Sequence, residues 1–350
     1  MDILEYDKAL DFSIKALNIQ PQNNDYNHGK AIALKYLGRV DEAKKILEGI
    51  IKNDNVSTQT YIALGMIYLS EKQFEKGMNL YRKRSLDTKF SEIFKIKKWR
   101  PNLPISNKSI LLYSDCGLGD TIMYSRFIPL LKEIAKEVII QTDIELVDIL
   151  KENYPDITVI SKTEKRPKFD IVMPIMDIQL ALNIDFDNIP FTEGYLNTIE
   201  NKEVLNTKKK KIGLFWQGNK RVLKNRSIDL ELLKPLLSLK NAEFYSFSLD
   251  KDSETDKRII PLSKYIKNYS DTASLLKNLD LLITIDSSIV HMAGALGVKT
   301  YLLLPHTPEW RWFNDDYKCS WYNSVKIFKQ TENANWISVI SRVNEDLKLL

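Results

Sequence analysis

The sequence has few of the residues that cross-link a chain or bind metal ions. Its 350 residues include two cysteines, Cys116 and Cys319, and three histidines, His28, His291 and His306. Two cysteines so far apart exclude a dense disulfide framework and favour a reduced, cytoplasmic setting. None of these residues has the spacing of a zinc site. We therefore predict a protein that needs no metal ion and no resident cofactor.

Long apolar runs are missing as well. No stretch approaches the roughly 20 apolar residues of a membrane-spanning helix, and acids stand where a signal peptide has its basic start. The net charge is only +5, and the basic residues are scattered except at 208–211. That charge suits an anionic ligand, although a solvated lysine-rich surface explains it more simply. We expect no transmembrane segment and no nucleic-acid partner.

The first third of the chain contains a repeat instead. A bulky residue is followed three positions later by a small one at Tyr6/Ala9, Val40/Ala43 and Phe74/Gly77. The step is 34 residues each time, which is the period of tetratricopeptide repeats. We predict tetratricopeptide-like helices over 1–86, which would offer a surface to a protein partner. A generic helical bundle is the alternative. Residues 87–108 have no clean period and read as a connector.

Short apolar runs then alternate with helical patterns, which predicts an α/β protein with parallel sheets. Expected strands lie at 110–113, 138–141, 157–160 and 170–173, and then at 212–216, 243–248, 259–262, 281–285 and 300–304. Expected helices include 120–136, 144–153, 230–239, 271–279 and 288–296. We predict a Rossmann-like lobe over 109–205, a second one over 206–335 and a closing helix over 336–350. Ligands would bind at the carboxyl ends of the strands.

The segment 281–297 is the strongest candidate for a binding site. An apolar strand ends at Asp286, Ser287 and Ser288, and a helix with His291 in its first turn follows. The serines are suited to cap this helix, whose free N–H groups and positive dipole end favour a diphosphate. His291 would donate to the same phosphate. The alternative is a capped core helix with an incidental histidine.

A second candidate lies at 115–121, between the first expected strand and its helix. Gly117 and Gly119 permit tight backbone geometry beside a ligand. Asp120 would project from the carboxyl end of the sheet, where a carboxylate can act as general base toward an acceptor hydroxyl. Asp120 as a simple helix cap is the alternative.

A third candidate is the basic loop after residue 216. Gln217, Asn219, Lys220 and Arg226 lie in or beside it, and such a loop can clamp a diphosphate. A basic surface loop is the alternative.

Two tryptophans near these segments are candidates for stacking on a base or a sugar ring. Trp216 follows an expected strand, and Trp310 lies in the aromatic stretch 305–312. The aromatic stretch would serve equally well as a packed plug between domains.

Six motifs in order over 109–330 resemble one family. They are Gly-Leu-Gly-Asp-Thr at 117–121, Gly-Leu-x-Trp-x-Gly-Asn at 213–219, Arg-Ser-Ile at 226–228, Asp-Thr-Ala-x-Leu at 271–275, Asp-Ser-Ser-x-x-His-x-x-Gly-Ala-Leu-Gly at 286–297, and Leu-Leu-x-Pro-x-x-x-x-Trp-Arg-Trp ending at 312. With the preceding repeats, the chain resembles bacterial tetratricopeptide-linked glycosyltransferases related to the family-9 heptosyltransferases.

The resemblance implies a GT-B fold and metal-independent, inverting transfer from a nucleotide sugar. By residue-to-residue match, Asp120 would be the base, Asp286 and His291 would contact the donor, and Arg226 would neutralise the leaving diphosphate. The acceptor would be a protein, such as a flagellin or another surface protein, or a glycan or lipid. Asp115 stands where relatives often have glutamate.

Other functions stay open at the level of sequence. A non-catalytic scaffold would combine protein-binding repeats with a degenerate GT-B platform. An epimerase built from two Rossmann halves would release product without an acceptor. The pairs Asp185/Asp187 and Asp250/Asp252 have the spacing of a metal motif, but they lie outside the glycine turns and read as linker and strand-end acids.

Overall fold

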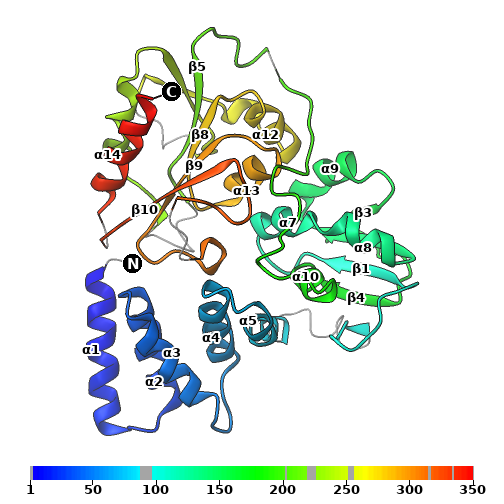
Figure 1. Cartoon of the computed structure of the whole chain (residues 1–350), viewed down its shortest axis with the longest axis vertical. Helices are drawn as coiled ribbons and strands as arrows, with labels where there is room; N and C mark the ends of the chain where they lie inside the picture. Colours follow the sequence, from blue (N-terminus) through cyan, green and yellow to red (C-terminus); the bar gives the residue numbers. More distant parts are fainter. Residues whose placement is uncertain are drawn as a thin grey trace.

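The computed structural model describes residues 3–86, 97–201, 203–218, 226–250, 256–313, 317–332 and 335–349. Three groups of elements are visible in Figure 1: helices at the N-terminal end, a small parallel sheet, and a larger parallel sheet packed against the C-terminal helix. We call them the helical segment (3–86), the first lobe (109–182) and the second lobe (210–347). Within the described ranges, no helix is both long and apolar enough to cross a bilayer.

The helical segment contains five helices and a short 3-10 turn. They are α1 (Ile3–Ile19), α2 (Asn24–Tyr36), α3 (Val40–Ile50), α4 (Thr58–Ser70), α5 (Phe74–Tyr81) and η1 (Arg82–Leu86). Helices α2 and α4 begin 34 residues apart, as do α3 and α5. A Cβ atom on Gly77 would lie 2.7 Å from the Leu69 side chain, so this small residue lets α5 lie close to α4. The helices follow the expected step, and their tetratricopeptide identity stays a prediction.

The first lobe is built on a four-stranded sheet. Its strands are β1 (Ser109–Tyr113), β2 (Glu137–Thr142), β3 (Thr158–Ser161) and β4 (Ile171–Pro174), all parallel in the order β3-β2-β1-β4. The single helix expected over 120–136 is wrong. The structure has α7 (Leu118–Ser125) and α8 (Ile128–Ile134), because Pro129 in the first turn of α8 has no N–H with which to continue α7. The helix expected at 144–153 is confirmed as α9 (Ile144–Asn153), and η2 (Ile175–Asp177) and α10 (Ile178–Ala181) follow β4.

The second lobe is built on a six-stranded parallel sheet in the order β10-β9-β8-β5-β6-β7. Its strands are β5 (Lys210–Phe215), β6 (Ala242–Ser246), β7 (Ile259–Pro261), β8 (Leu281–Ile285), β9 (Thr300–Leu304) and β10 (Val325–Lys329). The edge strand β10 was not expected from the sequence. The chain builds outward from β5 on one side and then returns to β8 on the other. This reversal between β5 and β8 is where open parallel sheets bind ligands.

Helices cover both faces of this larger sheet. They are α11 (Leu230–Leu233), α12 (Tyr269–Leu276), α13 (Ser288–Ala295) and α14 (Trp336–Leu347), with the 3-10 turns η4 (Leu236–Ser238), η6 (Ser263–Tyr265) and η7 (Trp310–Trp312). The helix expected over 230–239 is interrupted. Lys234 is the C-cap residue of α11 and Pro235 comes next, so only the short turn η4 continues the chain in a helical form. Between the lobes, the described residues of 184–209 form no helix or strand, as their polar composition predicts.

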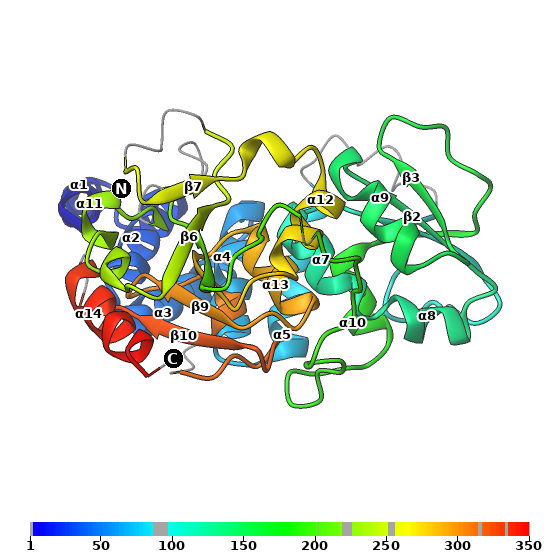
Figure 2. The same ribbon diagram turned by 90° about the horizontal axis from the view of Figure 1, so that it is seen from above.

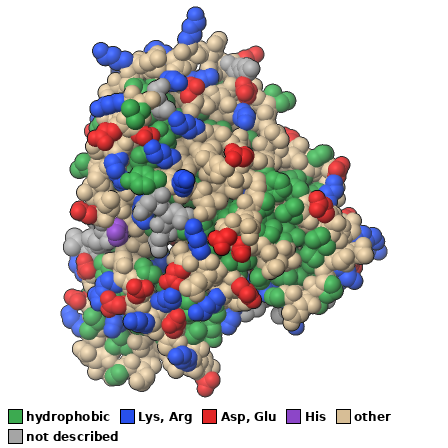
Figure 3. All heavy atoms as spheres, in the orientation of Figure 1, with side chains coloured by type: hydrophobic (Ala, Val, Ile, Leu, Met, Phe, Trp, Pro, Cys, Tyr) green, Lys and Arg blue, Asp and Glu red, His purple; other side chains and the backbone are tan. Residues whose placement is uncertain are grey.

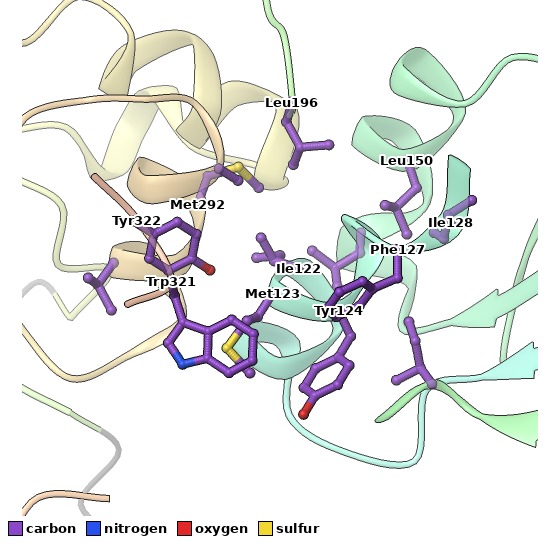
Figure 4. Close-up of a cluster of buried hydrophobic side chains, with 14 of the residues drawn as sticks. Ile122, Met123, Tyr124, Phe127, Ile128, Leu150, Leu196, Met292, Trp321 and Tyr322 are labelled. Carbon is purple, nitrogen blue, oxygen red and sulfur yellow. The ribbon is translucent and has the colours of Figure 1, made fainter. Parts of the chain in front are cut away.

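The two lobes share a hydrophobic core. Met123 and Tyr124 of α7 belong to it together with Met292 of α13, Trp321 and Tyr322, and Figure 4 shows these side chains where the lobes meet. The centroids of the Tyr124 and Trp321 rings are 6.0 Å apart. In the view of Figure 2, α7 and α13 lie next to each other where the two sheets meet. Because both helices begin at the carboxyl ends of strands, their N-termini face the same space.

A buried arginine strengthens this junction. Arg126 follows α7 and is fully buried, and its Nη1 donates to the Trp321 carbonyl at 2.9 Å and to the Pro190 carbonyl at 3.3 Å. Its guanidinium also lies over the rings of Tyr195 and Tyr322. Arg126 of the first lobe thus contacts both the second lobe and the connecting residues 184–209.

The helical segment packs against both lobes. Phe74 lies edge-on to Phe186 of the segment between the lobes, with centroids 5.0 Å apart. Arg82 Nη2 lies 2.8 Å from Asp177 Oδ2 of the first lobe, and the Lys72 ammonium lies 5.0 Å from the centre of the Phe313 ring of the second lobe. The helical segment is therefore a third layer of one assembly.

The face shown in Figure 3 has Lys or Arg and Asp or Glu side chains interspersed, and hydrophobic side chains gather over the first lobe at the right.

Candidate functional site

The two glycine- and serine-containing loops meet at one cavity. It has a volume of about 520 Å³ and lies between the beginning of α7 and the beginning of α13. Its lining includes eight predicted site residues, namely Gly117, Gly119, Asp120, Arg226, Asp286, Ser287, Ser288 and His291. The structure therefore brings together the predicted base of the first lobe and the predicted phosphate site of the second.

Gly119 allows the two helices to touch. A Cβ atom at this position would lie 2.7 Å from Cδ2 of His291 and 3.2 Å from the Cα atom of Ser288. No side chain fits there without moving the helices apart. The nearest neighbour of Gly119 is therefore α13, so this glycine acts by holding Asp120 beside the second lobe.

A line of alternating charges crosses the cavity from one lobe to the other. Asp120 Oδ1 accepts a hydrogen bond from Arg311 Nε, and Arg311 Nη1 lies 3.8 Å from Glu309 Oε2. Glu309 Oε1 is 3.1 Å from Arg226 Nη2, and Arg226 Nη1 is 3.0 Å from Asp286 Oδ2. Three carboxylates thus share two guanidinium groups in a partly enclosed space.

Two members of this line, Glu309 and Arg311, were not predicted. The aromatic rings of the stretch 305–312 favour a stacking or packing role, and the same stretch also contains the charged residues Glu309 and Arg311. Both side chains line the cavity, on and just before η7. The signal available in the sequence was the charged pair beside Trp310, and the sequence did not show which way it faces.

Burial sets the electrostatics of the line. Burial raises the pKa of Asp286, and the nearby Arg226 opposes this effect. Burial works against the charge of Arg311, but the attraction of Asp120 and its other neighbours outweighs it and raises the pKa of the guanidinium. Arg311 therefore stays charged, and an anionic ligand could compete with its carboxylate partners.

His291 is held as a neutral side chain. Burial lowers its pKa well below the usual value of 6.5, and three arginines act in the same direction. Its Nδ1 lies 3.0 Å from the Tyr322 hydroxyl, and its ring stacks on Trp312 with centroids 5.1 Å apart. With Nδ1 occupied by Tyr322, only Nε2 remains to meet a ligand in the cavity.

The N-terminus of α13 offers donors to the cavity. Ser287 is its N-cap residue, but its side chain makes no capping hydrogen bond, so the expected cap is wrong at this residue. The Ser287 hydroxyl oxygen is buried and has no hydrogen-bond partner among the described residues. The Ser288 hydroxyl pairs with the Tyr269 hydroxyl. The free N–H groups of the first turn and the Ser287 hydroxyl together suit an anion.

A second cavity of about 580 Å³ continues from the first. Phe215, Gly218 and Ser288 line both. The predicted residue Gln217 lies here, in a wall that also contains Phe247 and Tyr269. The two cavities form an elongated site along the carboxyl ends of β5 and β8. The arginines lie in the first cavity, and the second has aromatic rings beside Glu145, Asp250 and Lys267.

The predicted stacking roles of the two tryptophans do not hold. Trp216 is 1% exposed and packs in the core of the second lobe, on the same face as Ile212 and Leu214. Trp310 is 2% exposed and lies edge-on to Tyr81 of the helical segment, with centroids 5.8 Å apart. It therefore matches the alternative of a plug between domains. The predicted Asn219 and Lys220 lie outside the described residues.

Acidic pairs with a metal-like spacing are separate from this site. The Asp185 carboxylate accepts hydrogen bonds from the backbone N–H groups of Asp187 and Asn188, which is a local turn. Asp252 lies outside the described residues. Across the part of the chain that the structure describes, no three His, Cys, Asp or Glu side chains gather in a way that would hold a metal ion.

Comparison with known proteins gives only distant matches. No family model matches the chain, and no curated protein matches it significantly. A family-9 glycosyl transferase from Veillonella parvula is 13% identical, with a TM-score of 0.48 over 71% of this chain and 91% of that one. The E. coli ADP-heptose heptosyltransferase II is 14% identical, with a TM-score of 0.47 over 69% and 98%. An O-GlcNAc transferase from Thermobaculum terrenum is 11% identical over 98% and 89%, with a TM-score of 0.25. At these values, none carries an argument about function.

Proposed function

We propose that the protein is a GT-B glycosyltransferase that moves a sugar from a nucleotide-sugar donor to an acceptor hydroxyl. One observation carries this proposal. The cavity of about 520 Å³ joins a carboxylate of one lobe, Asp120, to a helix N-terminus and two arginines of the other. Two parallel sheets with a site at their carboxyl ends, together with the six motifs that resemble family-9 enzymes, point in the same direction.

The donor diphosphate would lie at the start of α13. The N–H groups of its first turn, the unpaired Ser287 hydroxyl and the Arg226 guanidinium supply hydrogen bonds and positive charge without a metal ion. Neutral His291 would add one hydrogen bond from Nε2. The nucleoside would extend into the second cavity, where Phe215 and Phe247 offer aromatic surface.

The reaction would be a single displacement with inversion. Asp120 takes the proton of the acceptor hydroxyl while its oxygen bonds to the anomeric carbon. The bond from that carbon to the phosphate oxygen breaks, and the leaving nucleoside diphosphate keeps the electron pair. Arg226 and the start of α13 stabilise the developing charge, which is the largest contribution in reactions of this kind.

Asp120 is not free to act while Arg311 holds its Oδ1. A diphosphate in the cavity is a stronger partner for a guanidinium than a single carboxylate, since it carries more charge and offers several oxygens. Donor binding would therefore draw Arg311 from Asp120 to the phosphate. The base would become available only when the donor is present. Asp120 would then not deprotonate an acceptor hydroxyl while no donor is bound.

The acceptor would be a protein, a glycan or a lipid-linked precursor. The helical segment contacts both lobes, at Asp177 and at Trp310, and this favours a protein acceptor, because repeat helices usually bind polypeptides. A flagellin or another surface protein is the first class to test.

The deciding experiment uses Asp120→Asn in the full chain. A panel of nucleotide sugars and acceptors is screened by product mass, with and without a chelator. We expect transfer by the wild type to fall by about 10²- to 10⁴-fold in the variant, with unchanged nucleotide binding by calorimetry. Full turnover in the variant would remove Asp120 from the base role. Nucleotide binding without any product would favour the non-catalytic scaffold.

A further inference from the structure

We infer that the helical segment is part of the transferase site, and that Arg84 is a positioning residue that fixes the loop carrying Asp120. This inference rests on the proposed function of Asp120. It goes beyond a partner-binding role for the helices, because it makes their last turn, η1, necessary for the geometry of the reaction.

The first observation is an ion pair between the segments. Arg84 Nη2 lies 3.0 Å from Asp115 Oδ2 in an ion pair whose atoms are not in hydrogen-bond geometry, and the two side chains are 12% and 2% exposed. Asp115 follows β1 and begins the turn through Cys116 and Gly117 that leads to α7 and Asp120. The charge that neutralises this buried carboxylate thus comes from the helical segment and not from the first lobe.

A second ion pair joins η1 to η2, the turn that packs against α7. Arg82 Nη2 lies 2.8 Å from Asp177 Oδ2 and also donates to the Trp99 carbonyl at 3.3 Å. Asp177 is fully buried in η2, which packs against α7. Two arginines of one short turn therefore reach two buried carboxylates, one before α7 and one beside it.

Residues in and next to η1 also contact the second lobe. The Arg84 guanidinium lies 4.8 Å from the centre of the Tyr81 ring, and Tyr81 packs edge-on against Trp310. Trp310 directly precedes Arg311, the partner of Asp120. Residues 81–84 thus contact both the loop that carries the base and the loop that carries the arginine paired with it.

These contacts determine position because a buried charge cannot simply lose its partner. Without the Arg84 guanidinium, the Asp115 carboxylate would be left unpaired in a nearly inaccessible place. The turn at 115–119 would have to move or admit water. A displacement of about 1 Å at a reacting group can reduce a rate by about 100-fold, even from a distance.

The test compares four variants of the full chain: Arg84→Gln, Arg84→Lys, the double variant Arg84→Gln/Asp115→Asn, and the control Arg39→Gln. Arg39 forms an exposed pair with Glu42 on the same helical segment, so its loss should change nothing. For Arg84→Gln we expect kcat to fall about 10- to 100-fold, with nucleotide affinity within about 2-fold of wild type because the donor site lies on the second lobe. Arg84→Lys should recover part of the loss.

A pH profile separates positioning from general damage. Burial raises the pKa of Asp115, Arg84 opposes this rise, and Asp115 also interacts electrostatically with Asp120. An unpaired Asp115 should therefore move the acidic limb of the pH–rate profile to higher pH in Arg84→Gln. The double variant lacks both charges and should return the limb to its wild-type position. It also provides a folded comparison if Arg84→Gln is unstable.

Two outcomes would overturn the inference. One is a wild-type kcat and pH profile in folded Arg84→Gln. The other is a double variant that folds but shows no recovery in the profile. If the wild type transfers no sugar from any donor, the proposed function fails first and this inference falls with it. Wild-type transfer with an unaffected Arg84→Gln leaves the proposed function standing and rejects only this inference.

Discussion

Two systems of ion pairs flank the loop that carries Asp120, and they differ in what lies beside them. The cavity system is the line Asp120, Arg311, Glu309, Arg226 and Asp286. Every member lines the cavity of about 520 Å³. A ligand that enters this space meets both arginines while their carboxylate partners hold them in place.

The junction system consists of Arg82 with Asp177 and Arg84 with Asp115. None of these four residues lines the cavity. Their carboxylates are 0% and 2% exposed, and their arginines come from the helical segment. No ligand can replace these partners without separating the segment from the first lobe.

The difference separates binding charge from structural charge. Arginines beside a cavity can exchange a carboxylate partner for a phosphate, so they remain available as hydrogen-bond donors to a ligand. Arginines in a closed junction stabilise one arrangement of segments, and breaking such a pair leaves an uncompensated buried charge. Substitutions in the two systems should therefore change different measured quantities.

The largest expected effect comes from Arg311→Gln in the cavity system. It removes the guanidinium that we assign first to Asp120 and then to the donor phosphate. We expect kcat to fall by about 10²- to 10³-fold, and nucleoside diphosphate affinity by about 10-fold, which corresponds to about 1.4 kcal/mol. Steady-state transfer assays and calorimetry measure the two effects.

Arg258→Gln is the matched control for that variant. Arg258 forms a close but half-exposed pair with Asp256 in the same lobe, so its loss should leave both quantities unchanged. Equal nucleotide affinity in Arg311→Gln and wild type would contradict the exchange of Arg311 from Asp120 to phosphate.

A smaller but different effect is expected from Arg82→Gln in the junction system. The substitution leaves the Asp177 carboxylate, which is 0% exposed, without its guanidinium. We expect the free energy of unfolding to fall by about 3–5 kcal/mol, with nucleotide affinity unchanged at a temperature where the variant is folded. Urea unfolding followed by circular dichroism gives the first quantity. A variant as stable as wild type would show that water already compensates Asp177.

The cavity system also shows how far the sequence predicts a site. Asp120, Asp286 and His291 could be predicted, because glycine or serine turns directly after apolar strands fix them at the carboxyl edge of a sheet. Arg311 could not. It lies in η7, and the direction of its side chain depends on how Trp310 docks against the helical segment. That contact joins residues more than two hundred positions apart.

The sequence around Trp216 already indicates that this side chain is buried. Ile212, Leu214 and Trp216 alternate along one strand direction, and alternate residues of a strand share a face. All three are buried in the same core. In the same way, Pro129 and Pro235 already marked the breaks in the two helices that were expected to be continuous. Packing between segments was the part that local patterns could not supply.

The smallest expected effect concerns protonation at the cavity. His291 is 3% exposed, and burial lowers its pKa well below 6.5. Its imidazole is therefore neutral when folded, whereas in the unfolded chain it takes up a proton as the pH falls through its usual value. The unfolded state then binds more protons, so stability must decrease as the pH drops below about 6.5.

This loss of stability at low pH predicts a measurable difference in unfolding free energy between wild type and His291→Gln. On lowering the pH from 7.5 to 5.5, the wild type should lose on the order of 1 kcal/mol more of its unfolding free energy than the variant. Urea unfolding at the two pH values gives this difference, and it cancels the contribution of other titrating groups such as His28, whose pKa burial also lowers. Equal losses in the two proteins would mean that His291 takes up its proton in the folded state. His291 would then be a charged ligand of the phosphate. It would act like the arginines of the cavity system and not as a neutral hydrogen-bond donor.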